Sequence, residues 1–147
     1  MLQPVRIGHV VLKVRDLDRS LAFYRDFLGF KVVSELSNVM IFLAADGLNH
    51  HDLALLRVGA QAPSPVSNAV GLYHVAIQLA DFAAVQAAHA LLTERGLLRG
   101  AIDHGVTRSL YTADPDGNEI ELYCDAPRSE WEGRVNEAMT VKPLVID

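Results

Sequence analysis

Two stretches of this 147-residue chain follow one plan: GHVVLKVRDLDRSLAFYRDFLGF at residues 8–30 and YHVAIQLADFAAVQAAHALLTERGL at residues 73–97. Each begins with a histidine and a six-residue alternating run, HVVLKV or HVAIQL, which predicts a half-buried β-strand. An aspartate follows, Asp18 or Asp81, and apolar residues at helical spacing then predict a helix that a glycine ends. The chain therefore contains two copies of one predicted strand–helix unit.

Three more strand-like runs follow each predicted helix. They are KVVSEL, VMIFLAAD and HDLALLRV in the first copy, and a weak run near residues 97–102, SLYTAD and NEIELYC in the second. Both copies read βαβββ, which predicts an α+β fold. We expect a single domain over residues 1–147, with module one at about 5–60, a Pro- and Ser-rich connector at about 61–70, module two at about 71–124 and a C-terminal tail at 125–147.

The composition narrows the class of protein. Half of the residues are hydrophobic and 21% are charged, as expected of a chain with a packed core. The net charge is −5 and the basic residues are scattered, so we expect no nucleic-acid partner. No secretory signal and no apolar run of about 18 residues is present, which predicts a cytoplasmic protein with no membrane partner. The single cysteine, Cys124, is interpreted as structural.

Two histidines occupy equivalent positions in the copies, His9 and His74. A single histidine on a strand is usually structural, but modules that pair about a pseudo-twofold axis would bring these two together as metal ligands. Two imidazoles and one carboxylate suit a non-haem Fe(II) ion with open coordination positions. The last predicted strand carries Glu119 and Glu121 on one face, and strand alternation admits either as the carboxylate.

These features resemble the vicinal oxygen chelate superfamily over residues 5–124. The resemblance implies that the paired modules form an open-barrel metal-binding cup with His9, His74 and Glu121 as ligands. Family members such as glyoxalase I generally take a fourth ligand from the last strand of the first module. Here that strand is HHDLALLRV, and we expect Leu55 at the position that corresponds to Glu121. An aliphatic side chain cannot bind a metal, so three ligands are expected and glyoxalase chemistry is disfavoured.

A second pattern narrows the resemblance to type I extradiol ring-cleavage dioxygenases. It consists of Ile102-x-His104, Leu110-Tyr111, Asp114-Pro115-x-Gly117 and Glu121. The resemblance implies that His104 and Tyr111 orient the substrate, and that His51, in the context His-Asp-x-Ala-Leu, is the acid-base group beside bound O2.

Several polar residues near these positions are given no chemical role. His50 is expected to point away from His51 as a surface residue, and His89 is interpreted as structural or exposed. The two aspartates of the Asp-Pro-Asp-Gly turn, Asp114 and Asp116, are interpreted as turn or solvated residues.

The expected function is that of an Fe(II)-dependent extradiol dioxygenase, with manganese as the other candidate metal. Its partners would be a small aromatic diol, O2 and a second copy of the chain in a homodimer. Two alternatives from the same superfamily stay open: a non-catalytic ligand-binding protein akin to antibiotic-sequestering members, and a glyoxalase-like or epimerase-like enzyme. Many extradiol enzymes have four modules, whereas this chain has two.

Overall fold

The computed structural model describes residues 1–66 and 68–146, which form two compact units. The first unit contains the residues up to Asn68 together with Asp114–Asn118, and the second contains Ala69–Ala113 and the residues from Glu119 onward. The boundary near residue 68 falls in the predicted connector. The organisation as one domain stays a prediction.

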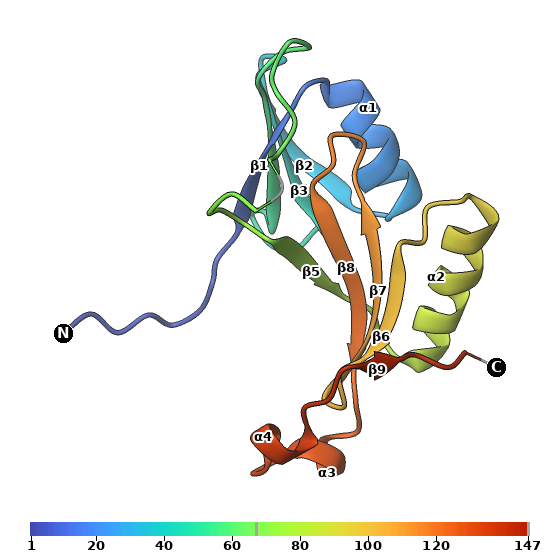
Figure 1. Cartoon of the computed structure of the whole chain (residues 1–147). Helices are drawn as coiled ribbons and strands as arrows, with labels where there is room; N and C mark the ends of the chain where they lie inside the picture. Colours follow the sequence, from blue (N-terminus) through green and yellow to red (C-terminus); the bar gives the residue numbers. More distant parts are fainter. Residues whose placement is uncertain (67, 147) are drawn as a thin grey trace. The chain divides into compact units, whose positions relative to one another are not determined.

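The first unit contains the predicted βαβββ module (Figure 1). Its four strands form one sheet in the order β1-β4-β3-β2, with β1 parallel to β4. The elements are β1 (Val10–Val14), α1 (Leu17–Leu21), the π-helical segment η1 (Ala22–Phe27), β2 (Lys31–Leu36), β3 (Met40–Ala44) and β4 (Leu53–Arg57).

The second unit repeats this module and extends it. Its sheet has the order β5-β8-β7-β6-β9, with β5 parallel to β8, so its first four strands follow the order of the first sheet. The elements are β5 (His74–Gln78), α2 (Phe82–Glu94), β6 (Gly100–Asp103), β7 (Thr107–Ala113), β8 (Glu119–Asp125), α3 (Arg128–Trp131), α4 (Val135–Ala138) and β9 (Lys142–Pro143). The α+β prediction with two βαβββ modules is confirmed.

Strand alternation and helix caps explain these elements. In β1 the side chains of Leu12 and Val14 are buried, whereas Val11 and Lys13 are exposed, as the period of two predicts. The first helix is capped by Asp16 rather than by the predicted Asp18, because the Asp16 carboxylate accepts the N–H of the residue three positions later. The second helix has its predicted cap: the Asp81 carboxylate accepts the N–H of Ala84 at 2.9 Å.

The strand registers correct the predicted counterpart of Glu121. Val11 and Ala76 each lie two positions after the histidine that opens their module; Val11 pairs with Ala54 and Ala76 with Glu121. The counterpart of Glu121 is therefore Ala54, and the prediction of Leu55 was wrong by one residue. The side chain of Leu55 points to the other side of the sheet, since strand neighbours alternate. Because alanine also lacks a donor atom, the first module still offers no carboxylate at this position.

The two aspartates of the Asp-Pro-Asp-Gly turn between β7 and β8 are turn residues, as interpreted, but they are buried rather than solvated, while Pro115 and Gly117 are exposed. The side chains of Asp114 and Asp116 are buried, and both residues belong to the first unit. Asp114 accepts the Tyr24 hydroxyl at 2.9 Å and the backbone N–H of Asn118 at 2.8 Å. Burial, followed by the charge of Asp114, raises the pKa of Tyr24, so this phenol stays a hydrogen-bond donor.

Asp116 connects the turn to the start of the first helix. Its carboxylate accepts the backbone N–H of Arg15 at 3.0 Å, pairs with the Arg15 guanidinium at 2.9 Å and also pairs with Arg19. A carboxylate that is removed from water needs such partners, and here two cations and one N–H supply them.

The helices of the structure are short compared with a lipid bilayer. Among the described residues, no helix has the length and apolar character needed to cross a membrane.

Candidate active site

Four of the predicted site residues lie in the second unit and come from neighbouring strands of its sheet. His74 begins β5, Glu121 lies in β8, and Tyr111 in β7 is paired with Glu121 in the strand register. His104 follows the last residue of β6 in the tight turn that leads to β7. Because β8 lies between β5 and β7, its Glu121 can contact side chains from both neighbours.

These four side chains form a continuous series of contacts. His74 Nε2 lies 3.0 Å from Glu121 Oε2, and the Tyr111 hydroxyl lies 3.4 Å from Glu121 Oε1. The same hydroxyl lies 2.8 Å from His104 Nε2. The Glu121 side chain is only 10% exposed, so these partners take the place of water around its carboxyl group. The sequence pattern did not predict the contact between Glu121 and Tyr111, although their positions on neighbouring strands could have suggested it.

Tyr111 is held as a protonated phenol. Burial and the nearby charge of Glu121 raise its pKa to about 12. The hydroxyl has one proton, so it donates either to Glu121 or to His104. When it donates to Glu121, its oxygen accepts a hydrogen bond from Nε2–H of His104; when it donates to His104, Nε2 is the accepting nitrogen. A phenol that keeps its proton at neutral pH can donate to an anionic oxygen of a ligand.

His74 and Glu121 have the chemistry of a metal half-site. Imidazole nitrogen and carboxylate oxygen suit non-haem iron. Nε2 of His74 and Oε2 of Glu121 are 3.0 Å apart, close enough for one ion to be held by both. The Nδ1 atom of His74 is buried and has no hydrogen-bond partner among the described residues, and the nearest carboxylate oxygen, of Glu119, lies 3.8 Å away. The residues therefore fit a metal.

The first unit carries a separate cluster of histidines. His9 lies just before β1 and is exposed, and its ring centroid is 4.1 Å from that of His51. His51 lies just before β4 and also contacts Phe42, with 5.1 Å between ring centroids. His50 is exposed as expected, but it does not point away, because its Nδ1 lies 2.7 Å from Nδ1 of His51.

The environment of His51 favours its neutral form. Partial removal from water, followed by the charges of His9 and His50, lowers the pKa of the His51 imidazole. A neutral imidazole has one nitrogen free to accept a proton, as a general base requires.

The strand registers also identify a residue that the sequence pattern missed. Phe42 in β3 pairs with Ala54, just as Tyr111 in β7 pairs with Glu121. The polar pair Tyr111–Glu121 of the second module thus corresponds to an apolar pair, Phe42–Ala54, in the first. Aligning the two modules on their histidines would not have found it, because Phe42 follows His9 by 33 positions and Tyr111 follows His74 by 37.

The three predicted metal ligands are divided between the units: His9 belongs to the first, and His74 and Glu121 belong to the second. Over residues 1–66 and 68–146, no three His, Cys, Asp or Glu side chains form a group that could hold a metal ion. His89, which was given no role, lies half-buried on α2.

Comparison with known proteins assigns the family. The model of the Glyoxalase/Bleomycin resistance protein/Dioxygenase superfamily matches residues 6–122. A catechol-2,3-dioxygenase of Bacillus subtilis is 40% identical over 134 residues, which are 88% of this chain and 45% of that protein. Biphenyl-2,3-diol 1,2-dioxygenase 3 of Rhodococcus globerulus is 37% identical over 122 residues, which are 82% of this chain and 63% of that protein. The chain thus spans about half the length of these curated relatives.

A solved structure from another branch is also similar. The crystal structure of lactoylglutathione lyase from Agrobacterium tumefaciens aligns with a TM-score of 0.61 at 27% identity, covering 82% of this chain and 94% of that one. Sequence and fold agree on the superfamily, whose members include dioxygenases and lyases. The chain belongs to the glyoxalase/bleomycin resistance/dioxygenase superfamily, also called the vicinal oxygen chelate superfamily.

Proposed function

We propose that this protein is an extradiol dioxygenase that opens a catechol-type aromatic ring with O2. The observation that carries the proposal is the contact series from His74 through Glu121 and Tyr111 to His104. It combines a metal half-site with two groups that can donate hydrogen bonds to diol oxygens. The similarity to a catechol and a biphenyl-diol dioxygenase supports the same reaction class.

We propose Fe(II) as the metal, with Mn(II) as the other candidate, and His9, His74 and Glu121 as its ligands. When bound, such an ion supplies adjacent positions for the diol and O2 and a path for electrons between them. The presence of Ala54 rather than a carboxylate at the counterpart of Glu121 supports a three-ligand set with open positions.

The remaining site residues would orient substrate and move protons. The protonated hydroxyl of Tyr111 donates a hydrogen bond to a diol oxygen, and His104 does the same through Nε2–H. Both donors stabilise negative charge that develops on the substrate during ring opening. His51, whose lowered pKa favours a neutral ring, accepts a proton from a diol hydroxyl.

The test is to load the protein with Fe(II) without air, add catechol or biphenyl-2,3-diol, and then admit air. A ring-opened, yellow product is expected. In the variants His104→Phe and Tyr111→Phe, iron per chain should stay unchanged while kcat falls by about 100-fold, because positioned proton donors contribute about that factor. His89→Phe on α2 is the matched control and should keep full turnover.

Two results would contradict the proposed activity, and a third would contradict the role of His104. Absence of a ring-opened product over a panel of monocyclic and biaryl diols would reject the activity. Isomerisation of a glutathione hemithioacetal by the metal-loaded protein would instead favour the lyase branch, to which the lactoylglutathione lyase structure points. Loss of iron from His104→Phe would mean that this histidine is a ligand rather than a proton donor.

A further inference from the structure

The C-terminal tail, residues 126–146, contacts the turn that carries His104. The backbone N–H of Thr140 donates to the carbonyl oxygen of His104 at 2.8 Å, and the Thr140 hydroxyl lies 3.2 Å from the carbonyl oxygen of Asp103. Further along the tail, Lys142 in β9 is paired with Asp103 in β6. The tail thus holds the backbone on which the imidazole of His104 is mounted.

The residue after His104, Gly105, packs tightly against the tail. Gly105 has a φ of +77°, a left-handed conformation that favours glycine, and a Cβ atom at this position would overlap the carbonyl oxygen of Ala138. Inside the turn, the N–H of Gly105 donates to the Asp103 carboxylate at 2.7 Å. The close contact with Ala138 and the hydrogen bond inside the turn therefore both restrict the conformation of the turn.

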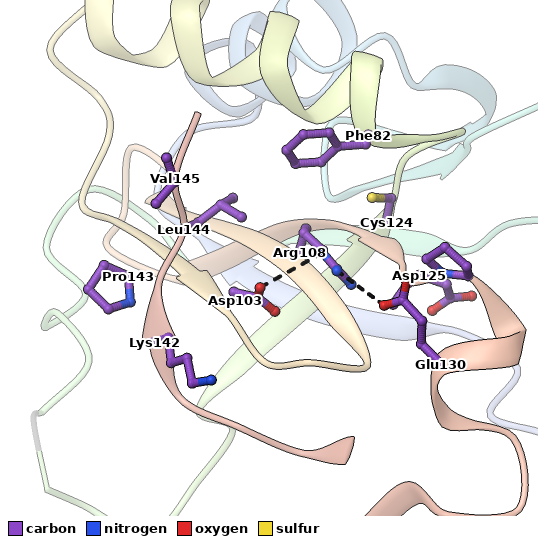
Figure 2. Close-up of a pocket in the computed structure, with 12 residues that line it drawn as sticks. Phe82, Asp103, Arg108, Cys124, Asp125, Glu130, Lys142, Pro143, Leu144 and Val145 are labelled. Atoms are coloured by element: carbon purple, nitrogen blue, oxygen red, sulfur yellow. Dashed lines mark hydrogen bonds and ion pairs between the residues drawn. The ribbon is translucent and has the colours of Figure 1, made fainter. Parts of the chain in front are cut away.

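Beyond these contacts, tail residues 142–145 line a cavity of about 590 Å³. Figure 2 shows Leu144 and Val145 of the tail on one side and the Cys124 thiol among the residues opposite. Arg108 in the same lining makes ion pairs at 3.3 Å to Glu130 and 4.0 Å to Asp103, and its guanidinium donates to the carbonyl oxygen of Gly105 at 3.3 Å. Backbone hydrogen bonds hold the tail beside this cavity, among them Thr140 N–H to the carbonyl of His104 at 2.8 Å and Leu144 N–H to the carbonyl of Ala101 at 3.0 Å.

We propose that Thr140 is a positioning residue for His104, and this inference rests on the proposed function. Thr140 fixes the main chain of His104, which keeps Nε2 at 2.8 Å from the Tyr111 hydroxyl, and that hydroxyl is next to Glu121. The tail is thereby coupled to the proposed proton donors through the backbone of the turn.

The decisive variant is Thr140→Pro, which removes the N–H that donates to His104. Met139 has a ψ of 128°, an extended conformation that a following proline accepts. Thr140→Ser retains both donors, and Val141→Ala, at a neighbouring side chain that is 79% exposed, is the matched control. We expect kcat for diol cleavage to fall on the order of 100-fold in Thr140→Pro, as for a catalytic group displaced by about 1 Å. Iron per chain should stay unchanged, and Thr140→Ser and Val141→Ala should keep their activity.

Two readouts do not depend on turnover. The imidazole NMR signal of His104, assigned by its loss in His104→Phe, should shift in Thr140→Pro and stay in place in both other variants. Cys124 is the only cysteine and is 2% exposed, so its reaction with a thiol reagent should accelerate when the tail detaches. Faster thiol reaction with an unchanged His104 signal would overturn the positioning role.

The same experiment separates this inference from the proposed function. If the wild-type protein cleaves no diol, the dioxygenase proposal fails, while the His104 signal still decides whether Thr140 positions the imidazole. Should Thr140→Pro fail to fold, Thr140→Val removes only the hydroxyl. A smaller shift of the His104 signal is then expected, and no shift would overturn the inference.

Discussion

At the scale of single residues, the buried carboxylate of Asp116 contributes more than its place in a turn suggests. It pairs with Arg15 and Arg19, which are 101 and 97 positions away in the sequence. Local sequence patterns report neighbours within one helix turn or one strand pair, so they could not identify these partners. The same limit applies to Tyr24, whose hydroxyl donates to Asp114, 90 positions away.

Replacement of Asp116 by alanine is expected to destabilise the protein by about 2 kcal/mol. A buried pair that loses one partner costs about 3–5 kcal/mol, and the partial exposure of both arginines reduces this cost. Urea denaturation should show a lower midpoint with an unchanged slope. Asp26→Ala, which breaks an exposed pair with Arg25, should leave the midpoint unchanged. Equal effects of the two variants would contradict the role of burial.

At the scale of elements, both βαβββ modules could be predicted from the sequence because alternation and helical spacing are local signals. The exact positions of single residues, such as a helix cap or a strand partner, were harder to predict from the sequence. The helix cap lies at Asp16 rather than Asp18, and the counterpart of Glu121 is Ala54 rather than Leu55. A shift of one residue changes the face of a strand, so a register has to be observed before a ligand position can be assigned.

The loop before β4 should give the protein part of its pH dependence. Asp52 accepts the N–H of Ala45 at 2.9 Å and the side-chain amide of Asn49 at 2.7 Å, and these bonds lower the pKa of its carboxyl. A lowered pKa in the folded state stabilises the protein above the usual value of 3.8, and this contribution is lost as the pH falls through the folded value.

Asp52→Asn should therefore be less stable than the wild type at pH 7, by about 1 kcal/mol or less because the group is partly exposed. The difference in Tm between the two proteins, followed by circular dichroism, should shrink as the pH falls from 5 to 3, taken as roughly the range of carboxyl titration. Glu35→Gln, at an exposed side chain of β2, controls for the loss of one charge. A difference that stays constant over this range would contradict the assignment.

At the scale of the whole molecule, the proposed set of metal ligands includes residues of both units, His9 of the first and His74 and Glu121 of the second. The repeated histidines led to the prediction of a donor set of two imidazoles and one carboxylate, while the choice of Glu121 over Glu119 came from the family resemblance, and both stay predictions. In the structure Glu121 Oε2 lies 3.0 Å from Nε2 of His74, whereas Glu119 Oε1 lies 3.8 Å from Nδ1. The geometry thus favours the same glutamate.

Removal of single ligands tests this set. His9→Ala, His74→Ala and Glu121→Ala should each weaken iron binding by more than about tenfold, measured as iron per chain after dialysis against a chelator. Glu119→Ala is the matched control, since this carboxylate lies on the same strand face, and it should retain more iron than Glu121→Ala. The reverse order would move the ligand role to Glu119.

The division of the chain into units has a consequence for synthesis. Residues 114–118 belong to the first unit, although the rest of that unit ends near residue 68. At about 5–20 residues per second, a ribosome needs roughly 5–20 s to proceed from Arg19 to Asp116. During this interval the nascent first module lacks the carboxylate that its two arginines will bind. Its final packing can therefore be completed only after most of the second module has been translated.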